Sequence, residues 1–104
     1  MSRHDERAVE AVAHEAAQFI AREAGSGSLI TVTRALLSGS HERITVYVSV
    51  FPDDKARAAL AFLERQREAF SEHLKSHVRI HPMPRVDFEL DVGELNRRRL
   101  DELT

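Results

Sequence analysis

The sequence of 104 residues contains no cysteine. This absence excludes disulfides, thiolate zinc sites and cysteine nucleophiles, and it gives no sign of an oxidising compartment. Glycine is scarce too: none of the four glycines lies in a GxGxxG or GxxxxGK pattern, so nucleotide hydrolysis has no support. A G-x-S-x-G nucleophile elbow is also missing. None of these catalytic or cofactor-binding motifs is therefore expected in this protein.

Long apolar runs are missing as well. No stretch of about 18 apolar residues occurs that could span a bilayer. Residues 2–7 are polar and charged, where a signal peptide would need an apolar run. We expect a soluble cytoplasmic protein with no membrane partner. Hydrophobic residues make up 42% of the chain, which is enough for the core of one small domain.

The overall charge of the chain does not indicate a nucleic-acid partner. Lys and Arg number 15 against 17 Asp and Glu, so the formal net charge is −2. The isoelectric point is near 6.3, whereas nucleic-acid-binding domains tend to exceed a value of about 9. Any basic binding site must therefore be local.

The spacing of apolar residues predicts the order helix, strand, strand, helix, helix or broken helix, strand. Residues three and four apart line a helical face, and alternating residues line a strand. Prolines at 82 and 84 are expected to stop the second helical region, and its polar stretch at 64–68 suggests a kink or break. The predicted ranges are a helix over 5–24, strands over 29–37, 44–51 and 85–91, and a helical region from about 56.

These elements define an α+β fold in two layers. The first two strands are joined by a short turn and should form an antiparallel hairpin. Three strands with helices on one face then give a single domain over residues 1–91. Residues 92–104 carry three leucines among charged residues, and we expect a C-terminal tail that is a short helix or partly disordered.

Three histidines spaced four apart offer a possible metal site. His73, His77 and His81 would share one helix face if the helix continued that far, and histidines at this spacing can chelate a metal. However, the strand-like residues 78–80 and Pro82 should end the helix before His81. Solvated or RNA-facing histidines at a helix end are therefore favoured over a metal centre.

The third predicted strand places three carboxylates outward, at Asp87, Glu89 and Asp91. They could form an acid/base cluster, but a strand with one solvated face produces the same pattern without any function. Only Tyr47 and Phe51 supply aromatic rings on the outward face of the second strand. Base stacking on the sheet, as in some RNA-binding domains, is thus disfavoured.

Basic residues gather in the second half of the chain. Between positions 63 and 86 there are five Lys and Arg residues but only three Glu residues, and a run of arginines follows in the tail. Basic side chains near a helix break and a strand edge are suited to phosphate contacts because they replace condensed counterions. A solvated charged helix face accounts for this composition equally well. The candidate RNA-binding residues are Arg65, Arg67, Lys75, Arg79 and Arg85, with Arg34, Arg43, Arg97, Arg98 and Arg99 as secondary candidates.

Several short stretches together resemble one known family. No stretch is specific alone, but together they keep the spacing found in the family along the whole chain, apart from one apparent short deletion in the loop at 25–28. The chain resembles bacterial ribosome-binding factor A over almost its entire length. The matching stretches are Arg22-Glu23, Thr31-Val32-Thr33, Ser38, Val46-Tyr47-Val48-Ser49, the apolar Leu60, Leu63, Phe70 and Leu74, Val78-Arg79-Ile80-His81, Pro84-Arg85-Val86-Asp87-Phe88, Asp91, and Arg99-Leu100-Asp101-Glu102-Leu103.

The resemblance implies a KH-like domain of the second topological type, whose element order agrees with the one predicted above. It also implies a non-catalytic assembly factor, a monomer when free, that binds the small (30S) ribosomal subunit and its 16S rRNA during late maturation and rRNA processing. A second hypothesis from another class is a KH-like protein-interaction module that has lost RNA binding.

One position departs from the family. KH domains clamp nucleic-acid backbone with a Gly-x-x-Gly loop, and this family has instead a helix kink marked by Ala-x-Gly. Alignment without gaps puts Gln66-Arg67-Glu68 there, and Gln and Glu favour a continuous helix. Either packing holds the kink or the helix runs straight. A shifted register would place Ala69-Phe70-Ser71 at the kink, but it needs a three-residue deletion before Val78.

Overall fold

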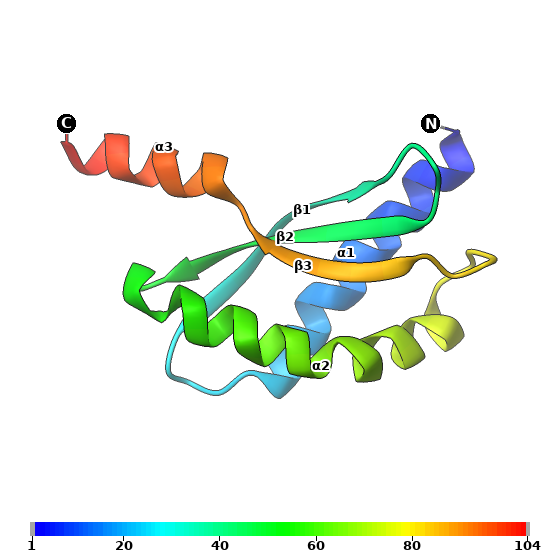
Figure 1. The fold of residues 1–104 in the computed structure, drawn as a ribbon, viewed down its shortest axis with the longest axis horizontal. Coiled ribbons are helices and arrows are strands. Elements are labelled where there is room, and N and C mark those ends of the chain that lie inside the picture. The colour runs from blue at the N-terminus through cyan, green and yellow to red at the C-terminus, as the bar shows by residue number, and fades with distance from the viewer. Residues whose placement is uncertain (1, 104) are drawn as a thin grey trace.

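The computed structural model describes residues 2–103 and has three long helices and three strands (Figure 1). A single 3₁₀ turn, Asp53–Lys55, precedes the second helix. The elements in chain order are α1 (Arg3–Glu23), β1 (Leu29–Leu37), β2 (Arg43–Phe51), α2 (Ala56–His77), β3 (Arg85–Leu90) and α3 (Val92–Leu103). The predicted α+β order is confirmed, and the second helical region is one helix rather than two.

The sheet has the strand order β1-β2-β3, with β2 in the centre. β1 and β2 form the predicted antiparallel hairpin, whereas β2 and β3 are parallel. A parallel pair needs a crossover connection, and here α2 supplies it. The side chains of Ile44, Val46, Val48 and Val50 on β2 are at most 1% exposed. They form the centre of the core.

α1 and α2 cover the face of the sheet that carries these aliphatic side chains. α1 passes behind the sheet in Figure 1, and α2 runs along its β3 side. The two helices meet where the rings of Phe19 and Phe70 lie 5.2 Å apart between centroids, a separation typical of favourable aromatic pairs. Leu63 and Leu74 of α2 are fully buried in the same core.

A β-bulge interrupts the pairing of β1 with β2. The register runs regularly to Val32 opposite Val48 and resumes with Arg34 opposite Tyr47, so Thr33 is the extra residue. Before the bulge Ile30 packs against the core, and after it Ala35 does. The bulge therefore changes which positions of β1 face inward, and the simple alternation expected of a strand does not hold there.

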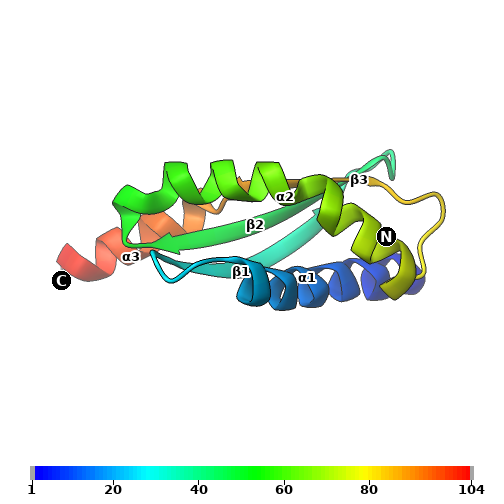
Figure 2. The same ribbon diagram turned by 90° about the horizontal axis from the view of Figure 1, so that it is seen from below.

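The helix α2 is continuous through Gln66, Arg67 and Glu68, but it is not straight. Its axis changes direction in its C-terminal half (Figure 2). The buried residues Leu63, Phe70 and Leu74 lie along its length, and Phe70 packs against α1. Of the two open alternatives, the structure matches a bend held by packing, without an Ala-x-Gly sequence.

The C-terminal end of α2 lies earlier than its prolines suggest. The helix ends at His77, and residues 78–84 continue as an irregular segment into β3. Val78 and Ile80 are buried against the core. Burial of these two alternating residues favours extended backbone over another helical turn, so the helix ends before His81 as the strand-like residues 78–80 predict, and the prolines are not needed to stop it.

The tail residues 92–103 form the helix α3, which projects away from the other helices (Figure 1). None of its residues is buried, and Leu100 and Leu103 are 64% and 83% exposed. Asp91 accepts a hydrogen bond from the backbone N–H of Glu94 at 3.0 Å, as an N-terminal capping residue does. Within residues 2–103, the structure has no helix long and apolar enough to cross a membrane.

Truncation of a buried helix residue tests this assignment of the core. Leu63→Ala leaves a cavity at a fully buried position, so we expect a loss of about 2–5 kcal/mol in the free energy of unfolding. Urea denaturation measures it. The control Leu103→Ala changes a largely exposed side chain and should change stability by no more than about 0.5 kcal/mol. Equal midpoints for the two variants would contradict this packing.

Candidate nucleic-acid interface

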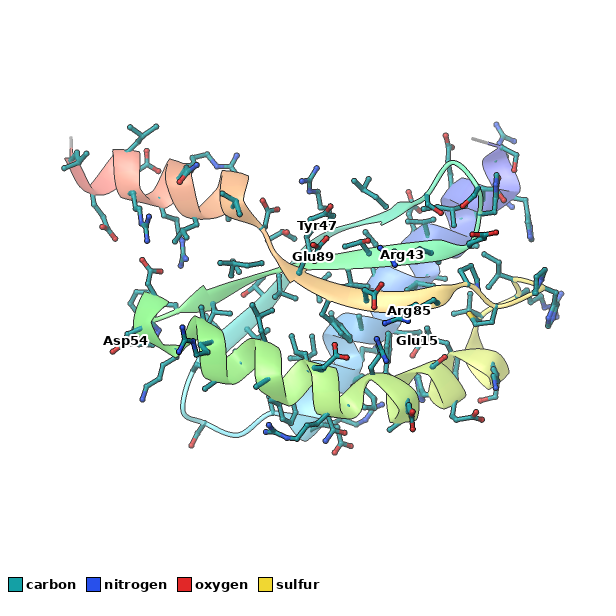
Figure 3. All side chains as sticks on the ribbon, in the orientation of Figure 1. Glu15, Arg43, Tyr47, Asp54, Arg85 and Glu89 are labelled. Carbon is teal, nitrogen blue, oxygen red and sulfur yellow. The ribbon has the colours of Figure 1, made fainter. Side chains whose placement is uncertain are left out.

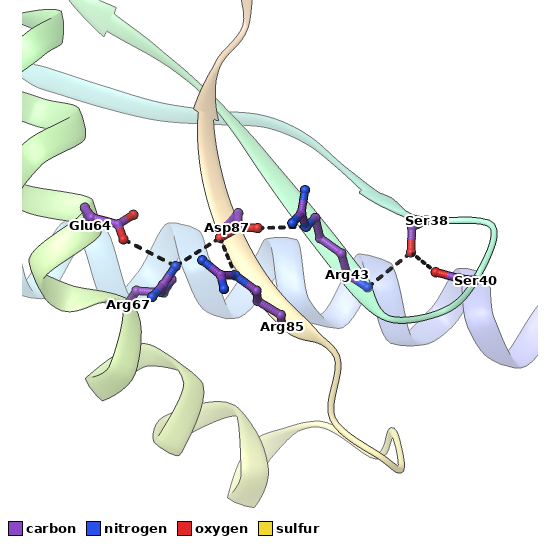
Figure 4. A network of polar contacts seen from close by, with 7 residues as sticks. All are labelled: Ser38, Ser40, Arg43, Glu64, Arg67, Arg85 and Asp87. Atoms are coloured by element: carbon purple, nitrogen blue, oxygen red, sulfur yellow. Dashed lines mark hydrogen bonds and ion pairs between the residues drawn. The ribbon is translucent and has the colours of Figure 1, made fainter.

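Three arginines from three elements surround one carboxylate, that of Asp87 on β3 (Figure 4). Arg67 Nη1 and Arg85 Nε donate hydrogen bonds to the same oxygen, Asp87 Oδ1, at 3.2 and 3.1 Å. Arg43 Nε lies 3.0 Å from the other oxygen, Oδ2. We call these four residues the Asp87 cluster.

The sheet register positions two of the arginines. Arg43 and Arg85 are opposite each other at the start of the parallel pair β2 and β3, and Asp87 lies two residues further along β3. Residues two apart on a strand share a face, so all three side chains project from the solvated face of the sheet. Figure 3 labels both arginines there. Arg67 reaches the same carboxylate from α2.

The arginines control the charge of Asp87. Burial alone would raise the pKa of this carboxyl, but the hydrogen bonds from Arg85 and Arg67 and the charges of Arg85 and Arg43 outweigh it. The pKa of Asp87 therefore lies below its ordinary value, and the group is ionised near neutral pH. Its carboxylate also reduces the repulsion among the three guanidinium groups.

The cluster retains a local excess of positive charge. Arg67 makes a further ion pair with Glu64 at 3.3 Å. The group therefore contains three guanidinium cations and two carboxylate anions. The side chains of Arg43 and Arg85 are each 59% exposed, and that of Arg67 is 25% exposed. Solvent can reach the cations, while Asp87 is mostly covered, with 19% of its side chain exposed.

A second group of polar residues lies at the β-bulge. The guanidinium carbon of Arg34 lies 4.4 Å from the centre of the Tyr47 ring, within the range of a cation–π contact. Arg34 Nε also lies 3.5 Å from Asp91 Oδ2, to which Thr33 donates a hydrogen bond at 2.6 Å. Thr33, Arg34 and Asp91 border an open hollow of about 680 Å³ between β1 and α3.

The other predicted cations are dispersed. Lys75 pairs with Glu72 at 2.9 Å, and Arg97 pairs with Glu94 on its own helix. Arg98 joins α3 to the end of β2 through Asp53 at 2.9 Å and the carbonyl of Val50 at 3.1 Å. The remaining candidates are exposed and make no hydrogen bond or ion pair within residues 2–103; they are Arg65, Arg79 and Arg99.

The three histidines do not form the metal site considered from their spacing. The rings of His73 and His77 stack at 3.9 Å between centroids, and His77 Nδ1 hydrogen-bonds the carbonyl of His73 at 2.8 Å. His81 lies beyond the end of α2. Throughout residues 2–103, no group of three or more His, Cys, Asp or Glu side chains could hold a metal ion.

The outward carboxylates of β3 are not equivalent, which the simple pattern of a solvated face missed. Glu89 is exposed, but Asp87 organises the arginines and Asp91 is only 7% exposed. A local signal for Asp87 was available, because Arg85 lies two residues before it on the same strand face. Nothing in the sequence links it to Arg67, twenty positions earlier.

Fold and site together define an α+β domain of KH-like architecture with a local arginine cluster on a nearly neutral chain. The model of one family, "Ribosome-binding factor A", matches residues 4–104. The chain belongs to the ribosome-binding factor A family, as its short motifs suggested.

Solved structures of this family share the fold. The crystal structure of ribosome-binding factor A from Thermus thermophilus is 24% identical, with a TM-score of 0.70 over 82% of this chain and 93% of that one. A homology model of the Thermus thermophilus factor, fitted into a cryo-EM map of a 30S–RbfA complex, is 25% identical with a TM-score of 0.65, covering 86% and 93%.

A third relative is more distant. The solution NMR structure of a ribosome binding factor A candidate from Thermotoga maritima is 19% identical, with a TM-score of 0.60 over 81% of this chain and 79% of that one. No curated protein matches this chain. At 19% and 24% identity, the likeness to the Thermotoga protein and to the Thermus crystal structure supports the fold alone.

A pH-dependent contact joins the two core helices. His73 Nε2 of α2 lies 2.8 Å from Glu15 Oε2 of α1, and this hydrogen bond is the main cause of a lowered pKa of Glu15. A carboxyl whose pKa is lower in the folded state stabilises the fold above its unfolded value and loses that contribution as the pH falls through the folded value.

We therefore expect Glu15→Gln to be less stable than the parent at pH 5, with a difference that shrinks as the pH falls below the ordinary value of 4.5. Urea unfolding from pH 5 to pH 2.5 measures this difference. The control Glu10→Gln alters an exposed glutamate of α1 without a hydrogen bond or ion pair in the described chain. A difference for Glu15→Gln that stays constant over this range would contradict the role of the contact.

Proposed function

We propose that this chain binds the small ribosomal subunit through its 16S rRNA and acts as an assembly factor during late maturation and rRNA processing. Membership of the ribosome-binding factor A family supports the proposal. Further support comes from the Thermus factor, whose model was fitted into a map of a 30S–RbfA complex. Binding would occur in the cytoplasm and would need no catalytic step.

The observation that carries the RNA contact is the Asp87 cluster. A chain of net charge −2 has no long-range attraction for RNA, so its affinity must come from a few cations at one place. Arg43, Arg67 and Arg85 meet this condition, because each lies within 3.2 Å of one shared carboxylate and all three retain exposed surface. Guanidinium groups suit phosphate because their planar donors match its oxygens.

The other predicted cations would extend this surface. Arg65 and Arg79 are exposed and lie on α2 and on the segment that follows it. Lys75 adds a charge already shared with Glu72. Arg34, Arg97, Arg98 and Arg99 lie nearer the bulge and α3 and would make peripheral contacts. The domain proposed over residues 1–91 would carry the interface, and α3 would lie outside it.

The affinity should be electrostatic and selective by shape. Each phosphate contact releases condensed counterions, so binding weakens steeply as salt rises. Arginine contacts to phosphate carry no sequence information, so the shape of the maturing subunit would select the site. A chain with this mechanism would bind a structured RNA surface and leave its sequence unread.

Co-sedimentation with free small subunits in sucrose gradients tests the proposal. The parent should accompany the subunits at low salt and dissociate as salt is raised. The double variant Arg65→Gln/Arg79→Gln should bind more weakly, with a log–log salt slope reduced by about one for each lost phosphate contact.

The matched control is Arg7→Gln/Arg22→Gln, which removes two exposed arginines of α1 and should leave binding close to that of the parent. Absence of the parent from the subunit fraction at low salt would refute the proposal. Association that is insensitive to salt would instead favour the KH-like protein-interaction module.

A further inference from the structure

A small hollow adjoins the Asp87 cluster between α2 and β3. It has a volume of about 130 Å³ and is lined by Arg67, Glu68, Ser71, Arg85 and Val86. Arg67 and Arg85 approach from opposite sides, one from the helix and one from the strand, and Asp87 Oδ1 accepts from both. A single carboxylate oxygen thus holds two guanidinium groups next to each other at the edge of this hollow (Figure 4).

Donor groups remain available there. Arg85 uses Nε to reach Asp87, so its two terminal nitrogens have no hydrogen-bond partner within the part of the chain that the structure describes. The hydroxyl of Ser71 likewise makes no hydrogen bond within residues 2–103. The acidic lining residue, Glu68, is exposed and therefore solvated. Its repulsion of an anion is screened by water.

We propose that Arg67, Arg85 and Ser71 form a subsite for one phosphate group, with Asp87 as the positioning residue that holds the two arginines in place. This inference rests on the proposed function in taking an RNA backbone phosphate as the ligand. A free phosphate ion presents the same oxygens. Arg43, bound to the other oxygen of Asp87, keeps that carboxylate oriented and adds positive charge nearby.

The role of Asp87 separates this subsite from a diffuse basic surface. If only net charge mattered, Asp87→Asn would remove a negative charge beside three arginines and would strengthen RNA binding. If Asp87 positions the arginines, the same change weakens their charge-assisted hydrogen bonds and lets the guanidinium groups move apart. RNA binding would then weaken although the site becomes more positive. The two models therefore predict changes in RNA affinity of opposite sign for Asp87→Asn.

Fluorescence anisotropy with a short RNA hairpin, which presents a structured phosphate surface, measures whether Asp87→Asn strengthens or weakens RNA binding. We expect Asp87→Asn to bind about tenfold more weakly than the parent, the loss of roughly one well-placed charged hydrogen bond. The control Asp54→Asn makes the same change of charge at the far end of the molecule (Figure 3). It should bind as the parent does or slightly more tightly. Tighter binding by both variants would overturn the proposal.

Two further variants address folding and chemistry. Arg85→Lys keeps the charge but removes the planar donors, so it should lose most of the affinity that Arg85→Gln loses. Arg57→Gln, at an exposed arginine of α2 without a partner in residues 2–103, is the control. Thermal unfolding of each variant shows whether it is folded at the assay temperature. Full affinity in Arg85→Lys would mean that charge alone acts there, against the subsite.

Titration with inorganic phosphate distinguishes the sources of the ligand. The side-chain NMR signals of Arg67 and Arg85 should shift more than those of Arg57 and Arg22, which lie outside the proposed interface, and Asp87→Asn should abolish the difference. Equal shifts for all arginines would overturn the subsite. Selective shifts without any binding to the RNA would leave a phosphate-ion site and refute the RNA backbone as its ligand.

Co-sedimentation keeps this inference separate from the proposed function. If the parent binds small subunits and Asp87→Asn binds them equally well, the subsite is wrong and the proposed function stands. If the parent fails to bind subunits but phosphate shifts Arg67 and Arg85 selectively, the proposed function fails and the phosphate subsite stands.

Discussion

Burial of the central strand β2 is the constraint on which the rest of the structure depends. Its four aliphatic side chains, at most 1% exposed, lie in one core with buried residues of both helices, and its two edges pair with β1 and β3. Because every second residue of β2 faces the core, the intervening residues must face solvent. Arg43 and Tyr47 belong to this second set. The hydrophobic alternation of one strand therefore determines which face of the sheet can carry a binding site.

The Asp87 cluster shows how a nearly neutral chain can hold a basic site. Three arginines placed close together repel one another, and flexible side chains would separate to relieve that repulsion. The buried part of Asp87 prevents this by bonding to all three. The carboxylate lowers the positive charge of the site but holds the arginine side chains in fixed positions. A count of charges along the sequence misses this effect, because it treats every acidic residue as weakening the binding of RNA.

Periodicity was sufficient for most of the fold. The alternation around Val46 and Val86 and the helical spacing around Val12 predict β2, β3 and α1, since each pattern reflects burial on one face. The binding site was harder to predict from the sequence than the fold. Seven of its ten candidate cations lie outside the Asp87 cluster, and strand alternation predicts the acid that joins Arg67 to Arg85 only as part of a solvated face. Contacts between α2 and β3 depend on how the helix lies on the sheet, which no local pattern encodes.

The β-bulge has a consequence for how the domain assembles. Thr33, the extra residue of β1, donates its hydroxyl to Asp91, which also caps α3 and lies 58 positions later. The hairpin of β1 and β2 can form from local contacts alone, but the bulge gains this hydrogen bond only after β3 has docked. Long-range contacts of this kind form late, since the intervening loop must close first. The bulge and the start of α3 are then joined in one late step, after the rest of the hairpin has formed.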